Sequence, residues 1–181
     1  MAHITVGVEY GIHSLLWLVD SGKPLSSRDL ADLQGISHSF LAKIFPKLEK
    51  AGIVRASEGA RGGYLLALPP EEISFLEIVD AIEGRKPLFD CQEIRGRCAL
   101  FDQSPPRWAT RGLCSVHAVM LRAEKAMRDT LAGQSLADLG QAVAEKAPSG
   151  FSSDVQAWIG NRLEGRLAKS PTAPAGEEDP S

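Results

Sequence analysis

The stretch SSRDLADLQGISHSFLAKIFPKLEKAG, residues 26–52, decides how this chain folds. It contains two helical segments separated by Gly35, and glycine is the residue that most often follows the end of a helix. Ser26 or Ser27 can cap the first segment and Ser37 the second, because a serine oxygen accepts a hydrogen bond from the free amides at a helix start. Two short helices joined by such a turn predict a helix-turn-helix.

The second of these helices has an apolar side and a polar side. The apolar stripe recurs at helical spacing and consists of Leu41, Ile44, Phe45 and Leu48. Pro46 lies inside the helix, where proline costs about 3 kcal/mol relative to alanine, so we expect a kink or a turn boundary there. The polar residues of the opposite side are Ser37, His38, Ser39, Lys43 and Lys47. Hydroxyls and lysines at a helix start suit base edges and phosphates in the major groove, with Ser27 and Arg28 as further candidates.

A glycine-rich hairpin follows the two helices. The apolar runs IVRAS and YLLAL are separated by EGARGG, residues 58–63, which is typical of a hairpin loop and predicts a winged helix-turn-helix. Arg61 lies among glycines that let the backbone approach a duplex, and a lone arginine suits the narrow minor groove. Winged helices also serve as protein-interaction modules, but the polar helix face and Arg61 together favour DNA binding.

The remaining segments predict a mainly α fold with a small β wing. An amphipathic helix over about residues 9–19 precedes the helix-turn-helix, and a capping box of Ser74 and Glu77 opens the helix of ISFLEIVDAIEG. A long helix follows, whose apolar seam consists of Val116, Met120, Ala123 and Met127. This seam suits helix-on-helix packing, either across a dimer or within its own domain. The last amphipathic helix carries Val155, Trp158, Ile159 and Leu163.

These segments divide the chain into four parts. We expect a winged helix-turn-helix at 1–70, a ligand-binding loop and dimerisation helix at 71–140, a helical extension at 141–169 and a disordered acidic tail at 170–181. The net charge of −3 reflects that tail, because residues 1–63 carry seven Lys and Arg against six Asp and Glu. No apolar run approaches the ~18 residues of a membrane span. The odd number of cysteines and the lack of an export signal favour the cytoplasm.

All three cysteines of the chain lie in CQEIRGRCALFDQSPPRWATRGLCSVH, residues 91–117. Six residues separate Cys91 from Cys98 and no base adjoins them, which argues against a thiol oxidoreductase. Soft thiolates bind iron–sulfur clusters, zinc or copper(I). Structural zinc sites usually pair their cysteines closely, whereas these wide gaps suit a larger, multi-atom cluster wrapped by a loop. Four arginines, at 95, 97, 107 and 111, either offset the charge of thiolates or are solvated.

A three-thiol site leaves one position for a fourth ligand. His117 follows Cys114 by three residues, so the two share a face if a helix begins there. Glu9 and His13 are four residues apart on the first helix and share a face as well. The sequence does not decide between these two sources.

In this order, the motifs resemble the Rrf-two family of bacterial transcription regulators, of the IscR/NsrR/RirA type. The resemblance spans roughly residues 3–140 and rests on GISHSFLAKIFPKLEKAGIV, GARGGYLLA, ISFLEIVDAIEG, the three cysteines ending in CSVH, and SLADL. It implies a homodimer that binds an operator in double-stranded DNA and is not an enzyme. It also implies one iron–sulfur cluster per protomer, whose presence, redox state or reaction with nitric oxide alters operator affinity.

The resemblance also implies a ligand set. The family's three cysteine ligands correspond to Cys91, Cys98 and Cys114. The fourth corresponds to His117 in one type of member, and to Glu9 or His13, sometimes from the partner protomer, in another. We favour a two-iron two-sulfur over a four-iron four-sulfur cluster. A zinc switch, a thiol switch or a cluster-free regulator of the same fold remains the alternative, since the gap between Cys98 and Cys114 is longer than is usual in the family.

Overall fold

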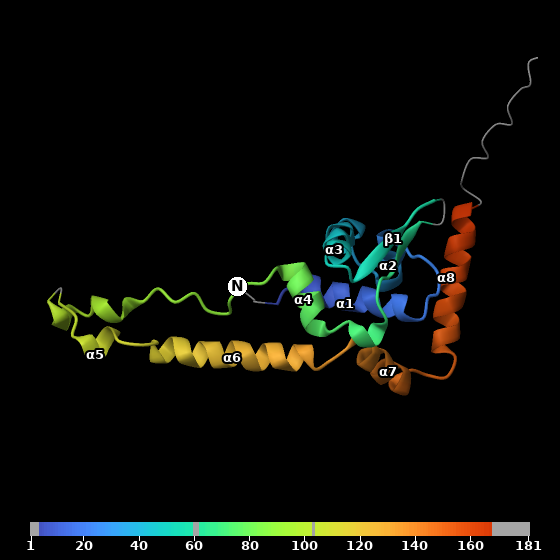
Figure 1. The fold of residues 1–181 in the computed structure, drawn as a ribbon. Helices are drawn as coiled ribbons and strands as arrows, with labels where there is room; N and C mark the ends of the chain where they lie inside the picture. Colours follow the sequence, from blue (N-terminus) through green and yellow to red (C-terminus); the bar gives the residue numbers. More distant parts are fainter. Residues whose placement is uncertain (1–3, 60–61, 103, 168–181) are drawn as a thin grey trace, which may run out of the picture.

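Helices and a two-stranded wing form the body of the molecule, which is known from a computed structural model describing residues 4–59, 62–102 and 104–167. The body is built from α1 (Val6–Val19), α2 (Ser27–Gln34), α3 (His38–Lys50), β1 (Val54–Ser57), β2 (Gly63–Leu66) and α4 (Phe75–Glu83) (Figure 1). A short 3₁₀ turn, Pro70–Glu72, joins the wing to α4. The predicted winged helix-turn-helix is therefore confirmed.

The caps of the helix-turn-helix follow from the sequence. Ser26 caps α2 in a reciprocal capping box with Asp29, and Gly35 ends the helix in the left-handed conformation at φ 67°. Ser37 takes the N-cap position of α3, but its Oγ lies 2.9 Å from Oγ of Ser39 and does not bond to the helix backbone. Helix α3 continues through Pro46 to Lys50, so the proline does not mark a helix boundary.

The wing is an antiparallel pair that is fastened to the start of α2. Val54 pairs with Leu66 at the base of the hairpin. Leu25 extends this sheet through an isolated bridge to Tyr64, with two hydrogen bonds of 2.8 and 3.1 Å between their backbones. Beside it, a Cβ on Gly63 would lie 2.5 Å from the carbonyl carbon of Leu25, so only glycine allows this approach.

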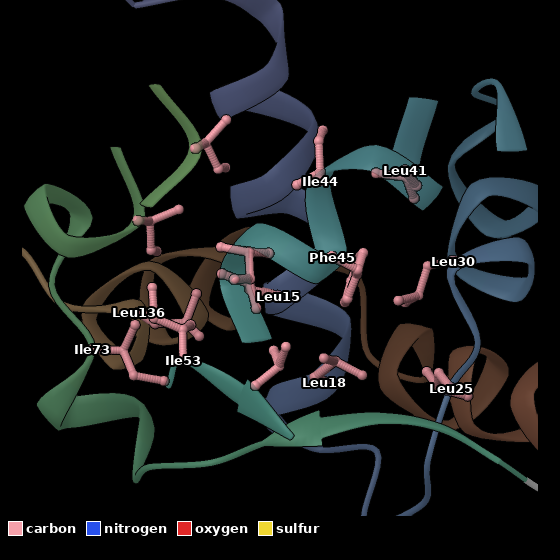
Figure 2. Close-up of a cluster of buried hydrophobic side chains, with 14 of the residues drawn as sticks. Leu15, Leu18, Leu25, Leu30, Leu41, Ile44, Phe45, Ile53, Ile73 and Leu136 are labelled. Atoms are coloured by element: carbon pink, nitrogen blue, oxygen red, sulfur yellow. The ribbon is translucent and has the colours of Figure 1, made fainter. Parts of the chain in front are cut away.

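The core lies between the helix-turn-helix, the wing and the helices on either side (Figure 2). The predicted stripe of α3 is confirmed, since Leu41, Ile44, Phe45 and Leu48 are all buried. Leu15 of α1 and Ile73 are buried with them, and so is Leu136 at the start of α7 (Leu136–Lys146). The core thus draws on residues far apart in the chain.

A second part of the chain extends away from this body (Figure 1). We call it the thiol lobe: the described residues 86–102 and 104–114, with the short turns Ile94–Arg97 and Ala99–Phe101 and α5 (Arg107–Thr110). The long helix α6 (Ser115–Ala132) leads back to the body, and none of its residues, all of which are described, is buried. Arg128 of α6 donates to Asp80 of α4 at 3.0 and 2.7 Å.

The last helix, α8 (Phe151–Leu167), stands at the other end of the body (Figure 1). Its predicted apolar face is confirmed, since Ile159 and Leu163 belong to the core and Val155 and Trp158 pack against it. Gln156 donates through Nε2 to the carbonyl of Asp20 at the end of α1, at 2.8 Å. The predicted disordered tail, 170–181, lies outside the described residues. In the described part of the chain no helix is long and apolar enough to cross a membrane.

Candidate nucleic-acid interface and metal centre

The start of α3 presents the polar residues that the sequence proposed as DNA contacts. Ser37, His38, Ser39 and Lys43 are exposed on the side of α3 that faces away from its buried stripe. From α2, Arg28 is exposed as well and Ser27 is half-buried. The proposed contact Arg61 lies outside the described residues. The remaining candidates thus lie on α2 and α3 of the helix-turn-helix, and all of them except the half-buried Ser27 are exposed.

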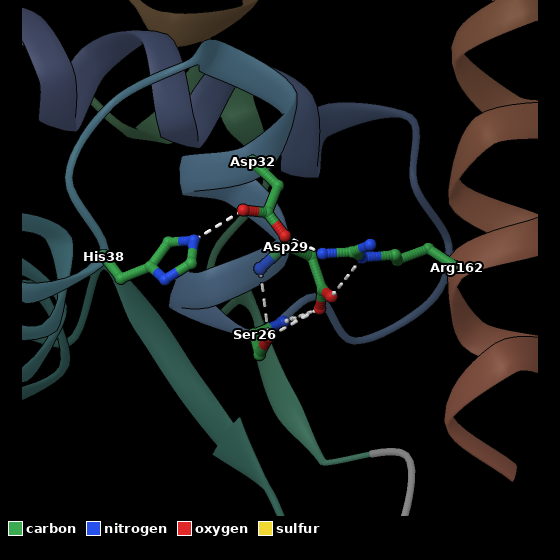
Figure 3. A network of polar contacts seen from close by, with 5 residues as sticks. All are labelled: Ser26, Asp29, Asp32, His38 and Arg162. Atoms are coloured by element: carbon green, nitrogen blue, oxygen red, sulfur yellow. Dashed lines mark hydrogen bonds and ion pairs between the residues drawn. The ribbon is translucent and has the colours of Figure 1, made fainter. Parts of the chain in front are cut away.

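Behind this surface lies a polar network that the sequence did not predict (Figure 3). Nε2 of His38 bonds to Oδ1 of Asp32, and the other oxygen of Asp32 pairs with Arg162 of α8. Arg162 also approaches Asp29, whose second carboxylate oxygen accepts from the backbone and hydroxyl of Ser26. Within this network, only the capping of α2 by Ser26 could be predicted from local sequence. The contacts of Arg162 could not, because it is 130 or more residues away from its partners.

Lys47, also proposed as a DNA contact, has a different partner in the body. Its Nζ donates to the carbonyl of Ile82 at 2.6 Å, near the C-terminal end of α4. That end of a helix carries partial negative charge, which favours an ammonium group. The contact links α3 to α4, and a DNA contact by Lys47 stays a prediction.

In the thiol lobe, Arg95 connects the segments that carry the first and last cysteines. It forms a bidentate pair with Glu93 at 2.5 and 2.7 Å and donates to the carbonyl of Gly112 at 2.9 Å. The hydrogen bond with Glu93 raises the pKa of Arg95, and negative charge on Cys114 and Cys91 raises this pKa further. Arg95 would thus offset part of the charge of these two cysteines in the thiolate state.

The two proposed sources of a fourth ligand lie in different places. His117, near the start of α6, has its ring 5.9 Å from that of Phe89, and it contributes after Arg95 to lowering the pKa of Glu93. Glu9 and His13 are exposed on α1, which packs against the helices of the body and the wing. Within one protomer, His117 is thus the candidate beside the thiol lobe.

The lobe's backbone is unusual in the described chain. Its non-glycine residues with positive φ are Glu93 at 45° and Asp102 at 40°, and both lie between the first and last cysteines. Such conformations cost of order 1–3 kcal/mol each and cluster at functional sites.

The chemistry of the donors fits an iron–sulfur cluster, although the side chains are not gathered. Cys91, Cys98 and Cys114 are free thiols, the first and last half-buried and Cys98 exposed. Three thiolates and one imidazole or carboxylate form a donor set that such clusters accept. Among the described residues, no three His, Cys, Asp or Glu side chains lie close enough together to hold a metal ion.

Large apolar side chains cover the outside of the lobe and of α6. Leu100 is 89% exposed and Trp108 77% exposed, and Val119 of α6 is 52% exposed. These exposed apolar side chains make the lobe and α6 a candidate interaction surface. The predicted seam on α6 is uncovered in the same way, since Val116 and Ala123 are exposed and Met120 and Met127 are half-buried.

The helix-turn-helix, its wing and the exposed polar face of α3 define a winged-helix DNA-binding protein. Residues 4–142 match the Rrf2 family, described as iron-dependent transcriptional regulators, and the chain belongs to this family. Members of this family are transcription regulators and not enzymes. This confirms the resemblance that the sequence motifs indicated.

Individual relatives agree with this assignment. The chain is 35% identical over 138 residues to Protein rrf2 of Nitratidesulfovibrio vulgaris, covering 75% of this chain and 85% of that protein. It is 42% identical over 60 residues to the transcriptional regulator IscR of Aliivibrio salmonicida, covering 33% of this chain and 36% of IscR.

Solved structures share the fold. The T. potens IscR structure has a TM-score of 0.59 at 25% identity and covers 83% of this chain and 95% of its own. CymR, the global cysteine regulator of B. subtilis, has a TM-score of 0.62 at 22% identity and covers 78% of this chain and 98% of its own.

Proposed function

We propose that this DNA-binding regulator holds one iron–sulfur cluster per protomer on Cys91, Cys98 and Cys114, and that the cluster's state controls operator affinity. The observation that carries the proposal is the thiol lobe itself: it carries three free thiols, and Arg95 links the segments of the first and last of them by its hydrogen bond to Gly112. When bound, the cluster supplies a redox-active anionic centre, which we expect to be of the two-iron two-sulfur type. Arg95 offsets that negative charge and holds the segments of Cys91 and Cys114 together through Gly112.

We further propose that a second copy of the chain covers α6 and the lobe. The support is the exposed apolar surface of Leu100, Trp108 and Val119, which the chain's own body leaves open. A homodimer would present two copies of α3, the proposed reading helix, to half-sites roughly 34 Å apart on DNA. In such a dimer Glu9 or His13 could serve the partner's thiols, whereas His117 would serve its own.

A chain of contacts gives the lobe a route to the reading helix. Arg128 of α6 donates a hydrogen bond to Asp80 of α4. Two residues further along α4, the carbonyl of Ile82 accepts a hydrogen bond from Lys47 of α3. A rearrangement of the lobe that turns α6 would therefore act on α3 through α4. We call the body of one protomer, which consists of α1 to α4, the wing, α7 and α8, its reading head. Operator affinity would follow the relative position of the two reading heads in the dimer.

Anaerobic purification of the full chain tests the cluster. We expect brown protein with iron and acid-labile sulfide near one cluster per protomer, and we expect Cys91→Ala to lose the colour. Mössbauer spectra of the wild type beside Glu9→Ala, His13→Ala and His117→Ala would identify the cluster type and the fourth ligand. Colourless protein without iron or sulfide would contradict the proposal.

The second candidate function is a cluster-free thiol switch. It is favoured by the exposed Cys98 and by thiols that are free yet not gathered into a metal site among the described residues. For this function, metal-free protein should change its operator affinity on mild oxidation and recover with dithiothreitol. A Cys98→Ser variant would lose that response, whereas a cluster regulator without its cluster would show none.

A further inference from the structure

Helix α8 lies beyond the region that matches the family, residues 4–142, yet its buried side chains belong to the core of the body. Ile159 and Leu163 are buried in the core, and they hold one face of α8 against the body. Arg162 lies between them in sequence and projects towards α2 (Figure 3). The ring of Trp158, one turn earlier on α8, lies 5.7 Å from the Arg162 guanidinium and confines it further.

Arg162 meets two carboxylates of α2 in different settings. Its Nε lies 3.5 Å from Oδ1 of Asp29, whose side chain is only 4% exposed. Its Nη2 pairs with Oδ2 of Asp32, which is half-buried. One guanidinium thus lies between two acids at the base of the helix-turn-helix and fixes the side chain of Asp32.

Asp32 passes this constraint on to the first residue of α3. Its free oxygen, Oδ1, bonds to Nε2 of His38. A carboxylate only accepts hydrogen bonds, so Nε2 must carry the hydrogen. In the neutral ring Nδ1 is then the acceptor, and it is the nitrogen left to meet DNA.

We propose that Arg162 is a positioning residue for operator recognition: through Asp32 it sets the orientation and tautomer of His38, so that Nδ1 accepts a hydrogen bond from a base amino group. The amino groups of adenine and cytosine are the donors that the major groove offers. The C-terminal helix thereby contributes to sequence reading without touching DNA. This inference rests on the proposed DNA contact of His38.

A double-mutant cycle between Arg162 and His38 tests the proposal. Wild type, Arg162→Gln, His38→Ala and the double variant are titrated against a duplex selected by the wild-type protein and against a scrambled duplex. The quantity compared is the ratio of the two affinities, because general electrostatic effects on phosphate contacts cancel in it. Arg162→Gln should lower this ratio by about 3- to 10-fold with His38 present, the size of one hydrogen bond, and by less than about 2-fold without it.

Three further variants separate positioning from loss of charge or of structure. Lys146→Gln removes the same charge from an exposed site at the end of α7 and should leave the ratio unchanged. Arg162→Lys keeps the charge and should recover part of the ratio that Arg162→Gln loses. Asp32→Ala removes the carboxylate that joins Arg162 to His38, at a helix position where alanine is favourable. It should lower the ratio as much as Arg162→Gln does. It therefore tests the positioning role even if Arg162→Gln loosens α8.

The outcomes distinguish the two levels of inference. Additive effects of Arg162→Gln and His38→Ala would overturn the positioning role of Arg162. So would an unchanged ratio in Asp32→Ala. If His38→Ala alone leaves the ratio unchanged, the proposed DNA contact of His38 fails, and the inference about Arg162 fails with it.

Discussion

The reading head and the thiol lobe differ in how many of their apolar side chains are buried. In the reading head, apolar residues from α1, α3, α4, α7 and α8 are buried together. The ends of α2 are capped by residues next to it in the chain, Ser26 and Gly35. Between Ile82 and Leu136, by contrast, Ala109 is the only described apolar residue that is buried. The reading head thus has a buried core of its own, whereas the described part of the lobe and α6 leaves large apolar side chains exposed.

The largest effect that can test this contrast is a core truncation. Phe45→Ala should lower the free energy of unfolding by about 3–5 kcal/mol, because Phe45 is fully buried among the helices of the reading head. Trp108→Ala in the lobe removes a larger side chain, but in the monomer, measured below the concentration at which the proposed dimer forms, the loss should stay within about 0.5 kcal/mol because Trp108 is 77% exposed there. Urea denaturation of both variants measures this, and similar losses would abolish the distinction between the two regions.

The next effect concerns the open surface of α6. Val119→Asp places a charge where we expect a second copy to pack, so it should turn a dimer into a monomer and weaken operator binding at least tenfold. Analytical ultracentrifugation over a range of concentrations measures the oligomeric state, and fluorescence anisotropy measures operator binding. The thermal midpoint of the reading head should change little, and a dimer that persists would show that α6 is not the interface.

A smaller effect is expected at the joint between the two regions. Arg128→Gln removes the bidentate pair with Asp80, whose two side chains are partly exposed, so it should lower the free energy of unfolding by less than the core truncation does. Hydrogen exchange should then speed up in α6 more than in α3. Equal acceleration throughout would mean that this pair stabilises the fold and not the joint in particular.

The smallest effect is the pH dependence of the same joint. The hydrogen bond from Arg128 lowers the pKa of Asp80 below its ordinary value of 3.8. A lowered carboxyl pKa stabilises the folded state above that ordinary value, and the contribution is lost as the pH falls through the lower folded value. The difference in unfolding free energy between wild type and Asp80→Asn should therefore be constant at neutral pH and shrink in acid below pH 3.8. A difference that grows in acid would contradict this pairing.

Local chemistry in the sequence predicted the reading head well. Ser26, Gly35 and the apolar stripe around Phe45 are interpretable because capping and helical periodicity act over a few residues. The Arg162 contact with Asp32 could not be predicted, because it depends on how α8 packs 130 residues away. The same holds for Lys47, which the polar face of α3 assigned to DNA and the tertiary fold joins to Ile82. For the thiols, spacing and the family resemblance predicted a donor set that stays a prediction, because the described side chains are not gathered and the proposed ligand or partner would have to bring them together.

The close approach of Gly63 to Leu25 has a mechanical consequence. Since backbone meets backbone there without room for a methyl group, the hairpin and the entry to α2 cannot slide past each other. The described strands of the hairpin and the helix-turn-helix therefore keep one relative position, so they would reach the duplex at one fixed stagger if both contact DNA as proposed. Any mismatch between that stagger and the grooves has to be absorbed by bending or twisting of the DNA, so operators rich in flexible pyrimidine–purine steps should be favoured even where no side chain touches them.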